Sequence, residues 1–128
     1  MPMRKLAQTL GIDDRVMFLG AQTDVRPFYG AADVFALPTR YDPFPNAALE
    51  ALACGLPLAT TTTCGAAELV TAANGAVVAA GDVAALAASL DHLCGAAPRM
   101  RDAARASVAH LELTTMAAQL MALYSRLV

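Results

Sequence analysis

Short apolar runs alternate with helical patterns along the chain. Four of these runs are brief, partly β-branched and bounded by Gly, Pro or Asn, which is typical of buried parallel strands. They are Val16–Leu19, Asp33–Leu37, Leu58–Thr61 and Ala76–Ala79. Helical spacing predicts helices over residues 4–10, 25–31, 46–53, 83–93, 99–110 and 115–127, with a short turn at 66–70. Alternating strands and helices predict an α/β fold built on a doubly wound parallel sheet.

Length and composition limit the possible classes of protein. A chain of 128 residues has room for one hydrophobic core, so we expect a single domain over residues 1–128. Hydrophobic residues make up 57% and charged residues 16%, which excludes an intrinsically disordered chain. The longest uncharged stretch, residues 51–67, contains glycine, proline and a run of four threonines, so we expect no membrane span.

The charge pattern excludes further partners. The net charge is −2 and no basic run occurs, which argues against nucleic acid as a partner. No apolar signal segment follows the N-terminus, so we expect a cytoplasmic protein. Cys54, Cys64 and Cys94 form no C-x-x-C pair, and we interpret them as buried free thiols rather than disulfide or zinc ligands.

The loop over residues 38–45 carries the richest candidate chemistry. In a parallel α/β sheet a ligand binds beyond the carboxyl ends of the strands, and this loop follows the strand predicted at residues 33–37. Pro43 and Pro45 favour extended backbone before them, and Asn46 is a suitable N-cap for the next helix. The first N–H groups of that helix, near residues 47–49, would have no intrahelical partner and suit an anion such as phosphate.

Two acids flank this predicted helix start. Glu50 lies one turn after Asn46 on the same helix face, and its carboxylate could accept from both hydroxyls of a ribose diol. Asp42 lies in the loop, where it could hold a sugar. Each acid also has a purely structural interpretation. Glu50 could be a charge that interacts favourably with the helix dipole near the N-terminus, and Asp42 could be a turn residue. A glycosidase pair is disfavoured because that chemistry needs a sugar, not a phosphate-binding helix start, between its acids.

These residues belong to a longer pattern. Asp42–Glu50 reads DPFPNAALE, an acid, seven residues and a glutamate, and ALACGLP follows it. The flanking strings are RVMFLG, DVRPFYGAADVFALPTRY and CGAAELV. Over residues 4–81 the whole set resembles the C-terminal, donor-binding domain of retaining glycosyltransferases of the GT-B fold, family 4. The resemblance implies a Rossmann-like, truncated C-terminal domain that binds a nucleotide diphosphate sugar.

The resemblance also implies roles for single residues. Glu50 matches the glutamate that binds the ribose hydroxyls of the donor. Asp42 matches the catalytic acid that contacts hydroxyls of the donor sugar. The backbone of four further residues matches the stretch that approaches the sugar and the diphosphate, namely Phe44, Pro45, Asn46 and Ala47. The implied chemistry positions and polarises the donor, and it needs neither a metal nor a cofactor.

The chain departs from the family pattern in three respects. The first acid is Asp42 where the family usually has Glu, which shortens its reach by about 1.5 Å, one C–C bond. The family's Arg and Lys that neutralise the leaving diphosphate precede the matched region, and we interpret Arg15, Arg26 and Arg40 as solvated charges instead. The N-terminal acceptor domain is also absent. We therefore expect a fragment that shows no transferase turnover by itself.

The function favoured by the sequence is the donor-binding part of a retaining glycosyltransferase. The sequence of residues 41–57 resembles that of bacterial members of the family, which build lipopolysaccharide or other cell-surface glycans. The acceptor would then be a glycan or a lipid-linked glycan, and the full-length parent would lie at the inner membrane periphery. The alternatives are a GT-B sugar-nucleotide epimerase and a non-catalytic α/β nucleotide-binding module.

The implied strand order, 3-2-1-4-5-6, makes Val16–Leu19 strand 3 and Asp33–Leu37 strand 4. Strands 1 and 2, which would lie between them, are missing. Either the two segments pair within the chain, or two chains associate and cover each other's open edges. We expect self-association, because unmatched edges and exposed apolar faces favour assembly.

Overall fold

A small parallel sheet forms the centre of the molecule. The computed structural model describes residues 2–127. Strand β2 (Leu58–Thr61) is buried along its whole length and pairs with β1 (Phe35–Leu37) on one side and β3 (Gly75–Val78) on the other. Phe35 pairs with Leu58, which pairs in turn with Gly75. The order β1-β2-β3 agrees with the consecutive strands 4-5-6 of the expected sheet.

Helices follow or precede each strand, as the sequence predicts for the α/β class. The α-helices are α1 (Pro2–Thr9), α2 (Arg26–Ala31), α3 (Asn46–Ala53), α4 (Val83–Val108) and α5 (Leu113–Tyr124). Two short 3₁₀ segments are η1 (Asp13–Arg15) and η2 (Gly65–Leu69), and the second of these occupies the predicted turn. This arrangement confirms the Rossmann-like α/β fold.

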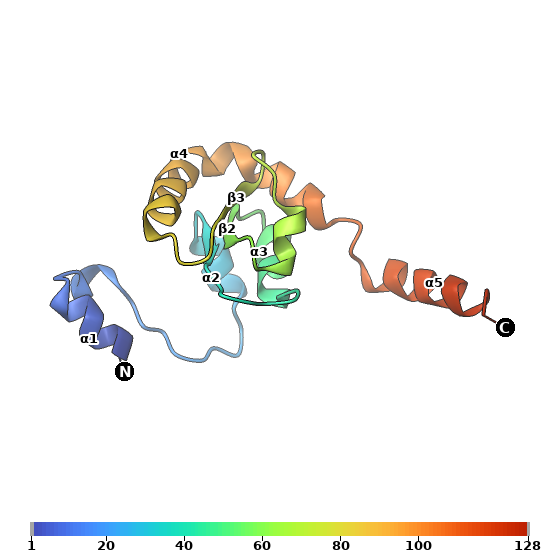
Figure 1. Ribbon diagram of the computed structural model, residues 1–128, viewed down its shortest axis with the longest axis horizontal. Helices are drawn as coiled ribbons and strands as arrows, with labels where there is room; N and C mark the ends of the chain where they lie inside the picture. The colour runs from blue at the N-terminus through green and yellow to red at the C-terminus, as the bar shows by residue number, and fades with distance from the viewer. Residues whose placement is uncertain (1, 128) are drawn as a thin grey trace.

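The two faces of the sheet have separate cores because successive strand residues point to opposite sides. Leu58 packs with Leu52 of α3 and with the last turns of α4. Ala59 faces the other way and packs with Leu93 and Met100 in the middle of α4. Helix α4 therefore reaches both cores, and Figure 1 shows it arching over the sheet from its yellow half to its orange half.

Helix α4 corrects one prediction. The sequence predicts two helices, over residues 83–93 and 99–110, whereas the structure has one helix that continues through Pro98. A proline inside a helix costs about 3 kcal/mol because it removes a hydrogen bond and crowds the preceding turn. Buried side chains on both sides of Pro98 offset that cost, namely Leu93, Ala96, Ala97, Met100 and Ala104. The curvature of α4 lets it follow both faces of the sheet.

The strand predicted at Val16–Leu19 is absent from the sheet. Within the described residues β1 pairs with β2 alone, so closure of Val16–Leu19 onto residues 33–37 does not occur. Met17 is 81% exposed, and Arg4 of α1 lies over the ring of Phe18 at 4.9 Å. A strand needs a neighbour for its backbone hydrogen bonds, and this segment has none. Self-association of the chain stays a prediction.

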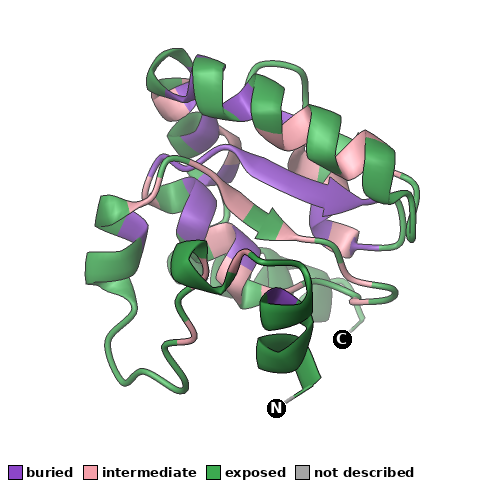
Figure 2. Ribbon diagram, turned by 90° about the vertical axis from the view of Figure 1, so that its left-hand side faces the viewer, coloured by how far each residue is buried: buried purple, intermediate pink, exposed green. Residues whose placement is uncertain are grey.

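Helices α1 and α5 lie outside the body formed by the sheet, α3 and α4 (Figure 1). Every described residue of α5 is exposed, in contrast with the purple core of Figure 2, where β2 and the inner faces of α3 and α4 gather. Among residues 2–127, no helix combines the length and the apolar character that crossing a membrane requires.

Helix α3 ends in a glycine cap that fixes its direction against the sheet. Gly55 has a φ of +83°, a conformation that glycine adopts without a Cβ penalty. Its N–H donates to the Leu52 carbonyl at 2.8 Å, and the next amide, Leu56, donates to the Ala51 carbonyl at 3.0 Å. This is the paired bonding of a Schellman motif. The chain then turns directly into β2, so the end of α3 and the start of β2 are held together.

Candidate functional site

The loop between β1 and α3 is held by the threonine run at the end of β2. Thr60 donates its hydroxyl to the Leu37 carbonyl at 2.9 Å. Thr61 and Thr63 donate theirs to the carbonyl of Thr39, at 2.6 and 3.3 Å. Side-chain hydroxyls thus replace the ladder bonds where β1 ends. The loop that carries the candidate acids is therefore fixed at the carboxyl edge of the sheet.

Asp42 is tied into this loop by its own backbone. Its N–H donates to the Thr63 carbonyl at 3.3 Å, and its carbonyl accepts from the Gly65 N–H at 2.8 Å. Its carboxylate Oδ1 accepts from the Phe44 N–H at 3.2 Å. The Phe44 amide, which the resemblance implies faces the donor, is thus bonded inside the loop in this structure. Asp42 is half-buried, so its carboxylate remains accessible to a ligand.

The start of α3 differs from the predicted one. Pro45 occupies the N-cap position with extended backbone, and Asn46 is the first helical residue rather than the cap. Asn46 follows Pro45, whose fixed φ already suits the transition from extended to helical backbone. The Ala48 N–H, expected to be free, donates to the Pro45 carbonyl at 3.1 Å. Because proline has no side-chain acceptor, no side chain of the cap residue bonds the amides of the first turn.

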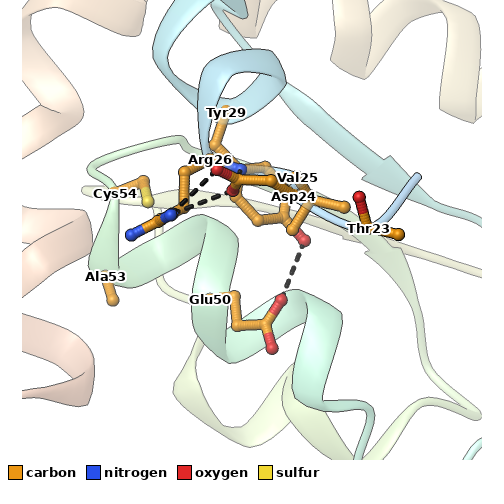
Figure 3. Close-up of a pocket in the computed structure, with 8 residues that line it drawn as sticks. All are labelled: Thr23, Asp24, Val25, Arg26, Tyr29, Glu50, Ala53 and Cys54. Atoms are coloured by element: carbon orange, nitrogen blue, oxygen red, sulfur yellow. Dashed lines mark hydrogen bonds and ion pairs between the residues drawn. The ribbon is translucent and has the colours of Figure 1, made fainter.

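Glu50 lies on the exposed side of α3, next to a surface cavity of about 530 Å³ between α2 and α3. Its Oε2 accepts a hydrogen bond from the hydroxyl of Tyr29 at 3.2 Å (Figure 3). Arg26 also borders the cavity, and it forms a two-pronged ion pair with Asp24 at 2.8 Å for both bonds. The remaining residues that line the cavity are Thr23, Val25, Ala53 and Cys54.

The charged groups around this cavity perturb one another. Burial, followed by the hydrogen bond to Glu50, raises the pKa of Tyr29 above its ordinary value. The hydrogen bonds from Arg26 lower the pKa of Asp24, and the same pairing raises the pKa of Arg26. Arg26 is thus exposed and paired, which fits the predicted solvated charge. Tyr29 keeps its proton at neutral pH and acts as a donor to Glu50.

The predicted residues surround the start of α3 without sharing one cavity. Glu50 borders the cavity just described, whereas Asp42 borders a second depression with Thr63 and Gly65. Phe44 and Asn46 border a third, together with residues from the loop between α4 and α5 and from α5. Pro45 and Ala47 are half-buried between these depressions. The backbone of one short segment therefore separates the two acids.

Sequence reasoning missed the residues that hold this segment. Tyr29 reaches Glu50 from a different helix, and the only sequence signal for it is a tyrosine hydroxyl, which must find a partner when the ring is buried. Gly65 leaves no room for a side chain, since an added Cβ would lie 1.6 Å from the Pro43 carbonyl oxygen. The threonine run is visible in the sequence, but the backbone carbonyls to which its hydroxyls donate are not.

The cysteine prediction holds in part. All three thiols are free, and Cys64 is buried while Cys54 is half-buried. Cys94 is exposed, which contradicts the expectation that it is buried, because it lies on the outer face of α4. Among residues 2–127 no group of three or more His, Cys, Asp or Glu side chains is arranged to hold a metal ion.

Fold and site together define a domain of the GT-B glycosyltransferase class, with a parallel sheet whose carboxyl edge meets a helix start flanked by acids. The chain belongs to the family of glycosyl transferases group 1, whose family model matches residues 1–96. This membership agrees with the resemblance found in the sequence.

Individual relatives support the same assignment. The lipopolysaccharide core biosynthesis glycosyltransferase LpsE of Rhizobium meliloti is 36% identical over 92 residues, which is 71% of this chain and 27% of LpsE. Sucrose-phosphate synthase from Thermosynechococcus elongatus superposes with a TM-score of 0.86 at 31% identity, over 98% of this chain and 33% of the synthase. Anabaena HepE, solved in complex with UDP, has a TM-score of 0.89 at 26% identity, over 98% and 36%. The chain thus spans about a quarter to a third of these proteins.

Proposed function

We propose that this chain binds the nucleotide diphosphate sugar donor of a retaining, family 4 glycosyltransferase. In this proposal the start of α3 receives the diphosphate, Glu50 binds the ribose hydroxyls and Asp42 contacts the donor sugar. The observation that carries it is the start of α3 at the carboxyl edge of the sheet, which has no side-chain cap, with Glu50 exposed one turn further on. The complex of the related HepE with UDP supports a nucleoside diphosphate as the ligand class.

The diphosphate role rests on the electrostatics of a helix start. The N-terminus of a helix carries about half a positive charge, and its first amides point outward toward an anion. Pro45 supplies no capping side chain, and no acid occupies the first turn of α3. The backbone of residues 44–47 is therefore the part of the loop best suited to a diphosphate, once the Phe44 amide exchanges its bond to Asp42 for the ligand.

The ribose role rests on the acceptor capacity of Glu50. An ionised carboxylate has about four lone-pair positions and donates nothing, which suits two adjacent hydroxyls. Tyr29 occupies one of these positions on Oε2, and the side chain is exposed to the cavity. The sugar role of Asp42 rests on its fixed backbone, because its bonds to Thr63 and Gly65 hold the carboxylate at the edge of the sheet.

The acceptor is inferred from relatives. LpsE acts in lipopolysaccharide core biosynthesis by its name, and we propose a lipopolysaccharide-type or other glycan acceptor for the whole protein to which this domain contributes. The acceptor would bind outside the 128 residues present here, on a further domain. The family assignment favours this transferase role over the epimerase and the non-catalytic module.

Calorimetry with UDP, GDP and ADP tests the donor role. Glu50→Ala should weaken binding of the preferred nucleotide by about ten- to a hundredfold, since a hydrogen bond to a charged group contributes about 1.5–3 kcal/mol. Asp91→Ala is the matched control, because Asp91 is an exposed acid on α4 away from the loop, and it should leave binding unchanged. Equal affinity of the wild type and Glu50→Ala would remove the ribose role.

A further inference from the structure

Tyr29 is a buried residue of the flanking string DVRPFYGAADVFALPTRY, and the sequence alone assigns it no role. It lies on α2, and its hydroxyl reaches the Glu50 carboxylate on α3 across 21 residues of sequence. The residue is only 9% exposed, and its hydroxyl lies where α2 and α3 border the cavity. Figure 3 shows the bond between the hydroxyl and the carboxylate as a dashed line below α2.

Packing fixes the position of this hydroxyl. The Tyr29 ring meets the Phe35 ring edge to face, with centroids 5.8 Å apart and planes at 79°. It also belongs to a buried cluster with Ala51 and Leu56, which flank the end of α3. A tyrosine has two side-chain torsions, and both are constrained when the ring is enclosed. The hydroxyl is therefore presented to Glu50 by the same packing that joins α2, α3 and β1.

The side chain of Glu50, by contrast, has few interactions that fix its orientation. The residue is exposed and long, and Tyr29 is the hydrogen-bond partner found for its carboxylate among the described residues. An unrestrained glutamate samples several rotamers and loses that freedom when it binds a ligand. The bond to Oε2 selects one arrangement before any ligand arrives. It uses one acceptor position and leaves the rest of the carboxylate for hydroxyl donors.

We propose that Tyr29 is a positioning residue that holds the Glu50 carboxylate in the orientation that accepts the vicinal hydroxyls of a ribose. This inference rests on the proposed donor-binding function and adds the residue that prepares its ribose contact. Tyr29 acts through Glu50 and does not touch the nucleotide. The raised pKa of Tyr29 agrees with this role, because the hydroxyl stays protonated and donating throughout the neutral range.

Tyr29→Phe separates the hydroxyl from the ring. The substitution keeps the edge-to-face packing on Phe35 and removes only the donor. Calorimetry on the full 128-residue chain should show about two- to tenfold weaker binding of UDP or GDP, the effect of one hydrogen bond. Tyr124→Phe is the matched control, because Tyr124 lies exposed on α5, and it should bind as the wild type does.

The 2′-deoxy nucleotides distinguish positioning from a structural role. With dUDP or dGDP, Glu50 loses one hydroxyl partner, so the loss caused by Tyr29→Phe should shrink to within about a factor of two. An equal loss with ribose and deoxyribose ligands means that Tyr29 acts on the fold in general, which overturns the proposal. Unchanged UDP binding in Tyr29→Phe also overturns it while leaving the donor function intact. A wild-type chain that binds none of these nucleotides overturns both.

A spectroscopic measurement tests the contact without any ligand. Titration of tyrosine absorbance follows all three tyrosines of the chain, so the difference between the titrations of the wild type and Glu50→Gln reports on Tyr29, whose pKa is raised partly by Glu50. The pKa of Tyr29 should fall toward its ordinary value in Glu50→Gln, because the charge that opposes the phenolate is gone. An identical titration in both proteins means that the two side chains do not interact in solution, which overturns the positioning role.

Discussion

Replacing Gly65 with alanine should detach the acid-bearing loop from the sheet. An added Cβ would lie 1.6 Å from the Pro43 carbonyl oxygen and 3.2 Å from Cδ2 of Phe44. The backbone of Gly65 is not in the left-handed region, so alanine is conformationally permitted there and the cost is steric. A C···O contact normally measures about 3.3 Å or more, so the two segments must separate by roughly 1.7 Å.

The size of the effect follows from the bonds that this separation breaks. The Gly65 N–H bond to the Asp42 carbonyl measures 2.8 Å, and the Asp42 N–H bond to the Thr63 carbonyl measures 3.3 Å. Each such bond contributes about 0.5–1.5 kcal/mol net, so Gly65→Ala should lower the free energy of unfolding by about 1–3 kcal/mol. Asp42 should also lose its fixed position at the edge of the sheet, and donor binding should weaken with it.

Urea denaturation followed by circular dichroism measures the change. Gly95→Ala is the matched control, because Gly95 lies inside α4 with no atom within 4 Å of an added Cβ. In that helical position alanine should stabilise the chain by up to about 1 kcal/mol, the opposite sign from Gly65→Ala. If Gly65→Ala unfolds at the wild-type midpoint, the loop does not pack against Gly65 as described.

Two further predictions concern stability. The pKa of Tyr29 is raised in the folded chain, so its contribution is complete below about pH 10, the unfolded value, and is lost as pH rises through the folded pKa. Urea midpoints between pH 8 and 11 should therefore fall more steeply in the wild type than in Tyr29→Phe, and parallel slopes would contradict this. Gly55→Ala should cost about 1–2 kcal/mol, because alanine is strained at a φ of +83° and its Cβ would lie 2.9 Å from Arg105; an unchanged thermal midpoint would show that the helix cap relaxes freely.

The local sequence pattern was sufficient to predict much of the fold. The buried strand at Leu58–Thr61 and the helix at residues 46–53 have the predicted bounds, because their periodicity and flanking prolines and glycines are local signals. The same kind of pattern at Val16–Leu19 predicts a strand that does not form. The difference is the partner: β2 has a neighbour on each side, whereas Val16–Leu19 lies beside α1 with no strand to complete its backbone bonds.

The candidate site likewise contains residues that the local sequence predicts and residues that only the tertiary structure reveals. Asp42, Asn46 and Glu50 lie within nine consecutive residues, so their spacing relative to one loop and one helix turn can be read without knowing the tertiary structure. The groups that restrain them come from α2, from the end of β2 and from η2, and a hydrogen bond such as that from Tyr29 to Glu50 spans 21 residues. The bond from Tyr29 to Glu50 exists only because α2, α3 and β1 pack together in one arrangement. The structural propensities of single residues contain no information about that packing. A continuous motif therefore reveals the groups that face a ligand, whereas the residues that orient them emerge only when the helices and strands are in place.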